Sequence, residues 1–397
     1  MKKYRQLLLL IITVVSVSLL LVYRHEYNRL HYVLEVFNFF GKPCNISSLE
    51  TSENVLGYHD WGPDPLWQEN ENIYVYSAFW IKQSEAQAIV LHIGNTEVAK
   101  NCFLWFEDKE KPIPGKFRYT EIEKDKENGE VAYFYYCSLT TSDHEPYAVS
   151  FAVKNKKIQE SKKVHLTKSR AHTQKVNTVI CVAPTAFNKS FFVEFLSYHK
   201  LVGIDNFIFY QSNIPYRLIK IVRNLSYRLG ISAYFRFWNY PKTEGILTRS
   251  IVEKDCTLRT ANYSDNSITL ELNEFIVPSG HRVSFNETFN ANQKMPNRIS
   301  LPVQIFCVDN THKRKPITVQ NIDVNYNNDN KVQYVYRNYG ESSIVVTHAV
   351  VKDVISIHKY VKCTQKPVRV YRDGSMLKFS VDLTRSTLVQ LYLHNDL

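Results

Sequence analysis

The spacing of hydrophobic and polar positions changes along the chain. Between residues 69 and 173, short runs of aromatic and β-branched residues are separated by charged turns, which is typical of antiparallel strands in a sandwich-like module. From residue 176 onward, strand-like apolar runs alternate with segments whose apolar residues recur every three to four positions. Such alternation predicts an α/β domain with a mainly parallel sheet flanked by helices.

The predicted elements can be placed by residue range. In the β-rich part, strands are expected at residues 72–80, 88–93, 102–106, 131–137 and 147–153. In the α/β part, helices are expected at residues 191–201, 216–229 and 247–259, and strands at residues 176–182, 204–210, 231–238, 267–277 and 388–394. Because ligands of parallel sheets bind beyond the carboxyl ends of the strands, we expect the functional site there.

An uncharged run, Leu7–Val22, follows Lys2, Lys3 and Arg5 near the N-terminus. As a helix it would span about 24 Å, close to the ~30 Å hydrocarbon core of a membrane. A cleaved signal peptide is the alternative, but Val22–Glu26 offers no small residues for cleavage. The run therefore predicts a transmembrane signal anchor with the N-terminus in the cytosol and the rest of the chain in the lumen.

The chain is predicted to divide into five segments. They are a cytosolic tail (1–6), the anchor (7–23), a stem (24–68), a smaller antiparallel β-rich module (69–173) and the α/β domain (174–397).

Composition limits the classes of protein to which the chain can belong. Hydrophobic residues make up 44% of the chain, enough to bury sizeable cores. The formal charge is +11, but Lys and Arg are scattered among acidic residues, so we expect no nucleic-acid partner.

Cysteines and glycosylation sequons bear on the compartment. The seven cysteines are Cys44, Cys102, Cys137, Cys181, Cys256, Cys307 and Cys363. No Cys-x-x-Cys motif occurs, which argues against a zinc ribbon. In an oxidising lumen we expect up to three disulfides and one remaining cysteine, with the pairing left open. N-glycosylation sequons stand at Asn45, Asn188, Asn224, Asn262 and Asn286.

Several short motifs occur in a fixed order. They are Thr178–Pro184, Phe195–His199, Gly203–Tyr210, Asp255–Cys256 and Glu274–Pro278. Taken together this ordered set resembles glycosyltransferase family 92, a galactosyltransferase-like group, and the match covers roughly residues 70–397. The resemblance implies a GT-A-like domain in a single-pass type II enzyme of the Golgi or ER membrane. It also implies transfer of a sugar, galactose from UDP-galactose in known members, to a glycan acceptor with inversion, assisted by a divalent metal, usually manganese.

The resemblance also assigns candidate site residues. The donor-binding candidates are Asp255, Glu271, Asn273 and Glu274; the metal ligands are Glu271 and Asn273, with His358 or His394. A metal would neutralise the charge that develops on the departing diphosphate, and a carboxylate base would take the proton of the acceptor hydroxyl. No residue is assigned as that base.

One departure from the family bears on activity. Where the family has Asp-x-Asp, this chain has Glu271 and Asn273. Glu271 is longer by one methylene, and Asn273 keeps an oxygen but loses a charge, so metal binding should be weaker. The alternative hypothesis is therefore a catalytically weakened or inactive lumenal paralogue that binds glycan or a partner transferase. Taken one by one, Asp255 also fits a solvated helix acid, and each histidine fits a structural hydrogen bonder.

Overall fold

The computed structural model describes residues 15–19 and, with interruptions, residues 67–394. The interruptions are residues 71–72, 82–83, 95–97, 110, 140–144, 153–161, 169–174, 212, 242–244, 280–283, 286–296, 309–314, 326–330, 339–346, 350–353 and 364–369. Contacts divide the chain into Met1–His59 and Asp60–Leu397. In the first unit only residues 15–19 are described, as helix, so most of the predicted anchor and stem lies outside the described residues. Within the described part, no helix combines the length and hydrophobicity that a membrane span requires.

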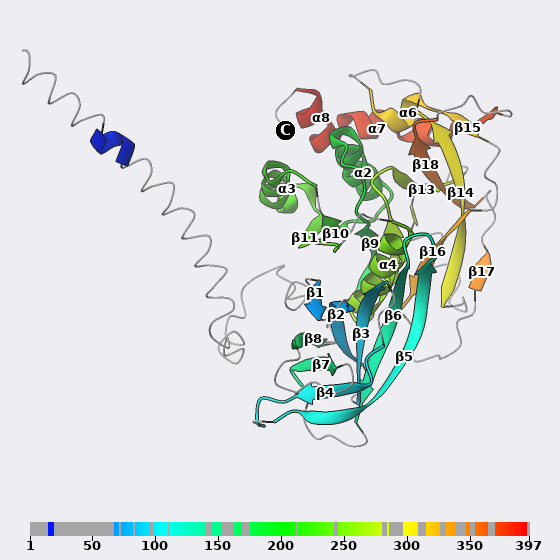
Figure 1. Cartoon of the computed structure of the whole chain (residues 1–397). Helices are drawn as coiled ribbons and strands as arrows, with labels where there is room; N and C mark the ends of the chain where they lie inside the picture. Colours follow the sequence, from blue (N-terminus) through cyan, green and yellow to red (C-terminus); the bar gives the residue numbers. More distant parts are fainter. Residues whose placement is uncertain are drawn as a thin grey trace, which may run out of the picture. The chain divides into compact units, whose positions relative to one another are not determined.

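The first sheet of the unit Asp60–Leu397 forms a closed ring (Figure 1). Its strands are β1 (Gln68–Asn70), β2 (Ile73–Ile81), β3 (Glu85–Ile93), β4 (Asn101–Trp105), β5 (Ile113–Asp125), β6 (Glu130–Ser138), β7 (Ala148–Ala152) and β8 (Val164–Lys168). The order is β1-β2-β3-β6-β5-β4-β7-β8, and a parallel pairing of β8 with β2 closes the ring. The antiparallel β-rich module is thus confirmed, but it is a barrel-like ring and not a sandwich.

The second sheet is mixed. Its strands are β9 (Val176–Val182), β10 (Asn206–Gln211), β11 (Ser232–Phe237), β12 (Ser264–Leu270), β13 (Glu274–Pro278), β14 (Arg298–Cys307), β15 (Asp323–Asn325), β16 (Val332–Arg337), β17 (Thr347–Ala349), β18 (Ile355–Val361) and β19 (Val370–Arg372). Strands β11, β10, β9 and β12 are parallel neighbours. Beyond β12 the sheet continues through β16 and β14 in antiparallel pairs. The α/β class is confirmed, whereas the prediction of a mainly parallel sheet was wrong for this second half.

Helices cover both faces of the parallel strands. One face is covered by α2 (Lys189–Leu201) and the other by α4 (Ile246–Thr260), while α3 (Tyr216–Leu229) packs on β11. Helices α6 (Ile317–Gln320), α7 (Ser380–Arg385) and α8 (Thr387–Leu393) pack on α2, and η4 (Ser375–Phe379) packs on β13. Because side chains alternate along a strand, Ile180 and Val182 of β9 join the core with α2, whereas Val179 and Cys181 join the core with α4. Gly230 ends α3 in the left-handed conformation at φ 59°, which a residue without Cβ adopts freely.

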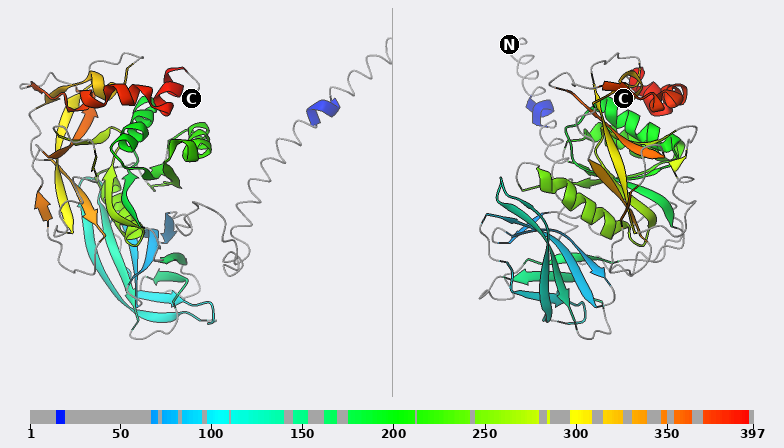
Figure 2. Two further views of the ribbon diagram at one scale, coloured as in Figure 1. Left: turned by 180° about the vertical axis from the view of Figure 1, so that it is seen from behind. Right: turned by 90° about the vertical axis from the view of Figure 1, so that its right-hand side faces the viewer.

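Helix α4 lies between the second sheet and the ring of strands (Figure 2). On one side it packs against β9 and β12, and on the other against β2, β3, β5 and β6. Trp67 and Tyr76 of the first sheet region and Trp238 after β11 share one core with α4. The ring is therefore built onto the α/β part through this helix.

Two predicted strands take another form. Residues 267–277 were expected as one strand, but the chain turns at residues 271–273 between β12 and β13. Residues 388–394 were expected as a strand and instead lie in helix α8 and its cap. Leu388 and Val389 of α8 are buried in the core that α2 shares, and a short apolar run alone does not distinguish a strand from a buried helix.

Candidate functional site

The parallel strands reverse their order of addition at β9. Strands β10 and β11 extend the sheet on one side of β9, and β12 lies on the other side. In open α/β sheets, ligands bind outside the carboxyl ends of the strands at such a switch point. The turn at residues 271–273 directly follows the carboxyl end of β12, so the acidic segment singled out in the sequence lies at this location.

The turn is fixed on both flanks. The N–H of Glu274 donates to the carbonyl of Glu271 over 3.0 Å, and the carboxylate of Glu274 accepts from the N–H of Glu271 at 2.9 Å. Leu272 is buried in the core. Asn273 donates its amide to the carbonyl of Tyr360 at 2.9 Å, so the turn is anchored on β18. Its amide oxygen is buried and has no hydrogen-bond partner among the described residues.

Two cations meet the two carboxylates of the turn. Arg249 of α4 donates from Nη1 to Glu271 at 3.1 Å and to both oxygens of Glu274 at 3.2 and 3.0 Å. Lys359 of β18 lies 2.8 Å from Glu271 Oε2 and 3.0 Å from Glu274 Oε1. The Glu274 side chain is fully buried, whereas those of Arg249, Lys359 and Glu271 are about one quarter exposed. We call these four side chains the charge cluster.

The electrostatics of the charge cluster follow from its contacts. Burial alone would raise the pKa of Glu274, but Arg249 and Lys359 together hold that pKa below its usual value. Burial would lower the pKa of Lys359, yet Glu274 and Glu271 raise it. Each partner thus favours the charged form of the other, and the formal charges of two carboxylates and two cations in the cluster balance.

The residues of the turn do not fit a divalent metal. The Glu271 and Glu274 carboxylates are already engaged by protein cations. A metal ion would add two positive charges to a partly buried cluster that is already neutral, which is unfavourable in a low-dielectric setting. Among the described residues, no group of three or more His, Cys, Asp and Glu side chains could hold a metal ion.

The two histidines proposed as further metal ligands lie elsewhere. His358 precedes Lys359 in β18, and neighbours in a strand point to opposite faces. His358 stacks on Phe306 at 4.4 Å, and its Nε2 is 3.8 Å from Asp373. His394 is the exposed cap of α8, a helix that packs on α2. The structure thus does not bring His358 to the face where Lys359 meets the carboxylates of the turn.

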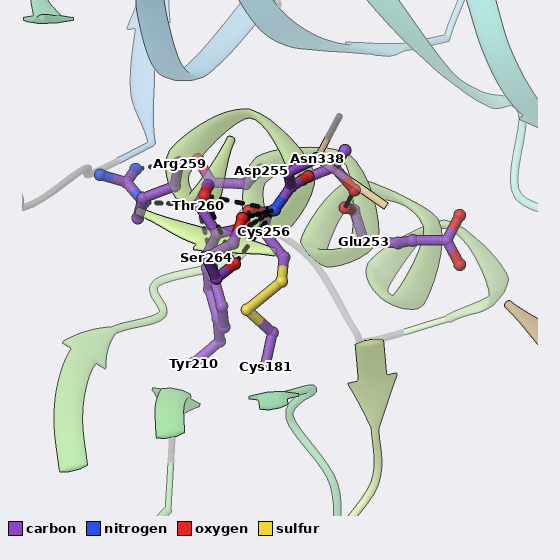
Figure 3. The surroundings of a disulfide bond; sticks show 10 residues. Cys181, Tyr210, Glu253, Asp255, Cys256, Arg259, Thr260, Ser264 and Asn338 are labelled. Carbon is purple, nitrogen blue, oxygen red and sulfur yellow. Dashed lines mark hydrogen bonds and ion pairs between the residues drawn. A yellow bond between two sulfur atoms is a disulfide. The ribbon is translucent and has the colours of Figure 1, made fainter. Parts of the chain in front are cut away.

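Asp255 is fully buried, and Figure 3 shows it beside Arg259, near the Cys181–Cys256 disulfide. Arg259 donates to both of its oxygens at 2.9 Å. Ser77 of β2 donates to it at 2.6 Å, and Tyr210 of β10 at 2.5 Å. Burial would raise the pKa of Asp255, but Arg259 holds the pKa below its usual range. Both carboxylate oxygens are engaged and no part of the side chain is exposed, a setting that favours a structural role joining α4 to β2 and β10.

Three disulfides occur in the described residues. They join Cys102 to Cys137, Cys181 to Cys256, and Cys307 to Cys363. The expectation of three bonds is confirmed, and the open question of Cys181 and Cys256 is answered, since they are paired between β9 and α4. Cys44 lies outside the described residues. So do sequons Asn45 and Asn286, whereas Asn188 and Asn224 are exposed and Asn262 is half-buried.

The sequence did not single out Arg249 or Lys359. Lys359 offered a signal, because it interrupts the otherwise apolar end of the strand-like segment Ile355–Val361. A lysine inside such a segment needs a buried partner. Arg249 offered none, since a basic residue early in an amphipathic helix is ordinary.

The family comparison gives this geometry its context. Residues 176–388, more than half of the chain, match the family model described as Glycosyltransferase family 92. The chain belongs to glycosyltransferase family 92. The match includes β9 to β18, the turn and the charge cluster, whereas the ring of strands precedes it. Family 92 membership implies a sugar donor and an acceptor.

The other comparisons add little. No match was found among curated proteins. A similar solved structure is described as a "Putative Glucose-1-Phosphate Thymidylyltransferase from Bacillus anthracis in Complex with a Sucrose", with 12% identity and a TM-score of 0.24. The alignment covers 55% of this chain and 83% of that one. A likeness this weak carries no conclusion on fold or ligand.

Proposed function

We propose that this family 92 chain transfers a sugar from a nucleotide-sugar donor, UDP-galactose by analogy with known family members, to a glycan acceptor with inversion. The observation that carries the proposal is the position of the turn 271–273 at the carboxyl end of β12, beside the switch point of the parallel strands. The parallel half of the sheet, with helices on both faces, supports a GT-A-like domain.

The proposed reaction is a single displacement. The bond between the anomeric carbon and the diphosphate oxygen breaks, and its electron pair leaves with UDP. A bond forms from the acceptor hydroxyl oxygen to the opposite face of the anomeric carbon, and the hydroxyl proton passes to a base. Negative charge grows on the diphosphate, so cationic groups beside it stabilise the transition state.

Residues of the turn are proposed as the donor site. Arg249 and Lys359 are the partly exposed cations at this end of β12. They supply the positive charge that a diphosphate requires. Glu274 holds these cations in place and Asn273 anchors the turn on β18, while Glu271 is the carboxylate whose place the diphosphate would take. Asp255 is proposed to act indirectly, by fixing α4 and thereby Arg249.

The location of the enzyme is also a proposal. We propose a single-pass type II protein of the Golgi or ER membrane, anchored by residues 7–23, with the catalytic part in the lumen. The three disulfides support an oxidising compartment. Glycosidase sensitivity of the full chain at its sequons, combined with resistance to alkaline extraction from membranes, would test this location.

The experiment for the function is a transfer assay. The full chain, purified in detergent, is incubated with UDP-galactose and a panel of glycan acceptors, and UDP release and glycan product are measured. Product that depends on both substrates supports the proposal. Absence of product across several UDP-sugars and acceptors would contradict it.

A second candidate function is a non-catalytic paralogue that binds glycan or a partner transferase. The neutral charge cluster favours it, because Asn273 and the two cations leave no acidic metal site of the family type. The discriminating measurement is thermal stability in UDP. An upward shift of the melting temperature without turnover favours binding alone, since a ligand that binds only the native state stabilises it.

A further inference from the structure

The charge cluster has the composition of an occupied cation site. Two carboxylates of the turn converge, as they would around a metal, yet Lys359 Nζ lies within 3.0 Å of both of them. Arg249 completes the arrangement from the side of α4 and is itself held by the carbonyl of Thr269 at 2.7 Å. Two negative and two positive charges cancel, so no charge remains to attract a divalent cation.

We propose that Arg249 and Lys359 take the place of a divalent metal in this chain, so that a nucleoside diphosphate binds beside the turn in a metal-independent way. The identity of the ligand rests on the proposed function. The exclusion of metal rests on the contacts of the charge cluster alone.

The two cations are pre-positioned for this role. Lys359 stands opposite Glu274 in the antiparallel register of β13 and β18, so the backbone ladder fixes its origin. Glu274 is fully buried and remains as the permanent counter-charge of the cluster. Rigid placement of this kind lowers the cost of binding, because little ordering is left to be done when the ligand arrives.

Glu271 is the exchangeable member of the cluster. Its side chain is 25% exposed, and it shares Arg249 and Lys359 with the buried Glu274. A diphosphate that displaces Glu271 meets two positive charges and one negative charge, a net charge of +1. Charge-assisted hydrogen bonds from guanidinium and ammonium groups to phosphate are strong, so Glu271 acts as an internal competitor of the ligand.

The first test is a titration with Mn²⁺ alone, using the full chain in detergent and electron paramagnetic resonance of the free ion. Wild type is expected to show no tight site. Lys359→Met leaves Arg249 as the one cation beside the two carboxylates, so the cluster gains one net negative charge, and its Mn²⁺ affinity should exceed that of wild type by about tenfold or more. Lys254→Met on α4, outside the charge cluster, is the matched control and should behave as wild type. A tight Mn²⁺ site in wild type, or no gain in the folded Lys359→Met variant, would overturn the exclusion of metal.

The second test is a calorimetric titration with UDP, once in EDTA and once in Mn²⁺. The same affinity is expected in both buffers. Glu271→Gln removes the competitor and leaves a net charge of +1 on the partly exposed cations, so it should bind UDP about tenfold more tightly in EDTA, and it serves if Lys359→Met fails to fold. Binding only in Mn²⁺ would overturn the inference. If UDP binds in neither buffer while the Mn²⁺ results are as expected, the donor assignment fails and the exclusion of metal stands.

Discussion

Gly115 on β5 lies against the disulfide that joins Cys102 of β4 to Cys137 of β6. A Cβ atom at residue 115 would clash with Cys137 Sγ and would stand 3.1 Å from Cys102 Sγ. Both cysteines are buried in the core of the ring, so neither sulfur has room to retreat. The missing side chain is what allows β5 to pass the disulfide.

Replacement of this glycine should be costly. Gly115→Ala is expected to lower the free energy of unfolding by about 1–3 kcal/mol, because overpacking a filled core forces its neighbours to shift. Urea denaturation of both proteins measures the difference. Gly374→Ala is the control, since its Cβ would meet only the end of the Leu377 side chain and should cost less. Equal stability of Gly115→Ala and wild type would contradict the packing argument.

Glu194 of α2 is a buried carboxyl that binds the start of α6. Its carboxylate accepts from the N–H groups of Ile317 at 2.5 Å and Thr318 at 3.1 Å, at the start of α6. Burial raises the pKa of Glu194 to about 7, although these N–H groups act in the opposite direction. A carboxyl whose folded pKa is raised adds stability at low pH, and this stability is lost as the pH rises through about 7.

The pH dependence of Glu194 can be isolated by comparison with Glu194→Gln, whose amide does not titrate. Raising the pH from 4.5 to 8 should shrink the wild-type advantage in unfolding free energy by about 3 kcal/mol, at 1.36 kcal/mol per pKa unit. Burial lowers the pKa values of His199 and His358, so both histidines destabilise the folded state at low pH. They do so equally in both proteins, and their effect cancels in the difference between the two unfolding free energies. Chemical denaturation across this range provides the measurement. A constant difference between the proteins would disprove the assignment.

At the scale of elements, helix α4 connects the two sheets and the charge cluster. Its Cys256 is bonded to Cys181 of β9, its Asp255 is bound by Ser77 of β2, and its Arg249 belongs to the charge cluster. The helix was predicted almost to the residue, because its apolar positions follow a helical period. The residues that contact the helix were not predicted. Pairs such as Ser77 and Asp255 are 178 residues apart, so no local sequence pattern indicates that they meet.

Loss of the disulfide in α4 should therefore affect both stability and binding. Cys181→Ala combined with Cys256→Ala is expected to cost about 2–5 kcal/mol of unfolding free energy. It should also weaken UDP binding, since Arg249 would be held less rigidly. Thermal melting and calorimetry measure the two effects. Removal of the Cys102–Cys137 bond, which lies in the ring, is the comparison and should weaken stability while leaving UDP affinity unchanged. Unchanged UDP affinity in the variant without the Cys181–Cys256 bond would show that this disulfide does not position Arg249.

Other elements show where sequence patterns fall short. Strand β5 was not predicted, because charged and polar residues on both of its faces hide the alternation. The strand expected at residues 267–277 is two strands, since the buried Leu272 makes the turn look continuous with its flanks. The acidic segment was singled out from its residue types and its place in a strand-like run, but the turn within it was not predicted. Its two cations were missed, because they come from α4 and β18.

At the scale of the whole unit, the ring and the α/β part share one core. Trp67 and Tyr76 lie 5.8 and 4.9 Å from Trp238, ring centre to ring centre, and Tyr210 packs beside them. The family match begins at residue 176, but these contacts cross that boundary. The predicted division at residue 174 therefore marks a change of sheet, while the packing is continuous across it.

A fragment cut at that boundary should not be stable. Residues 174–397 alone would expose the Trp238 and Tyr210 rings and remove the Ser77 partner of Asp255, so we expect aggregation. Residues 60–397 should elute as a single species with a cooperative melt. Size-exclusion chromatography and near-ultraviolet circular dichroism test the pair. A soluble 174–397 fragment with the same melting temperature would show that the ring is dispensable for folding.

The central claim is that the turn 271–273 and its two cations receive the diphosphate of a sugar donor. The most direct measurement is a crystal structure of the chain with UDP bound in the absence of metal. We expect the diphosphate beside Lys359 Nζ and Arg249, at hydrogen-bond distances of about 3 Å, with Glu271 displaced. A diphosphate bound away from the carboxyl end of β12, or one held through a metal on Glu271 and Glu274, would contradict the account.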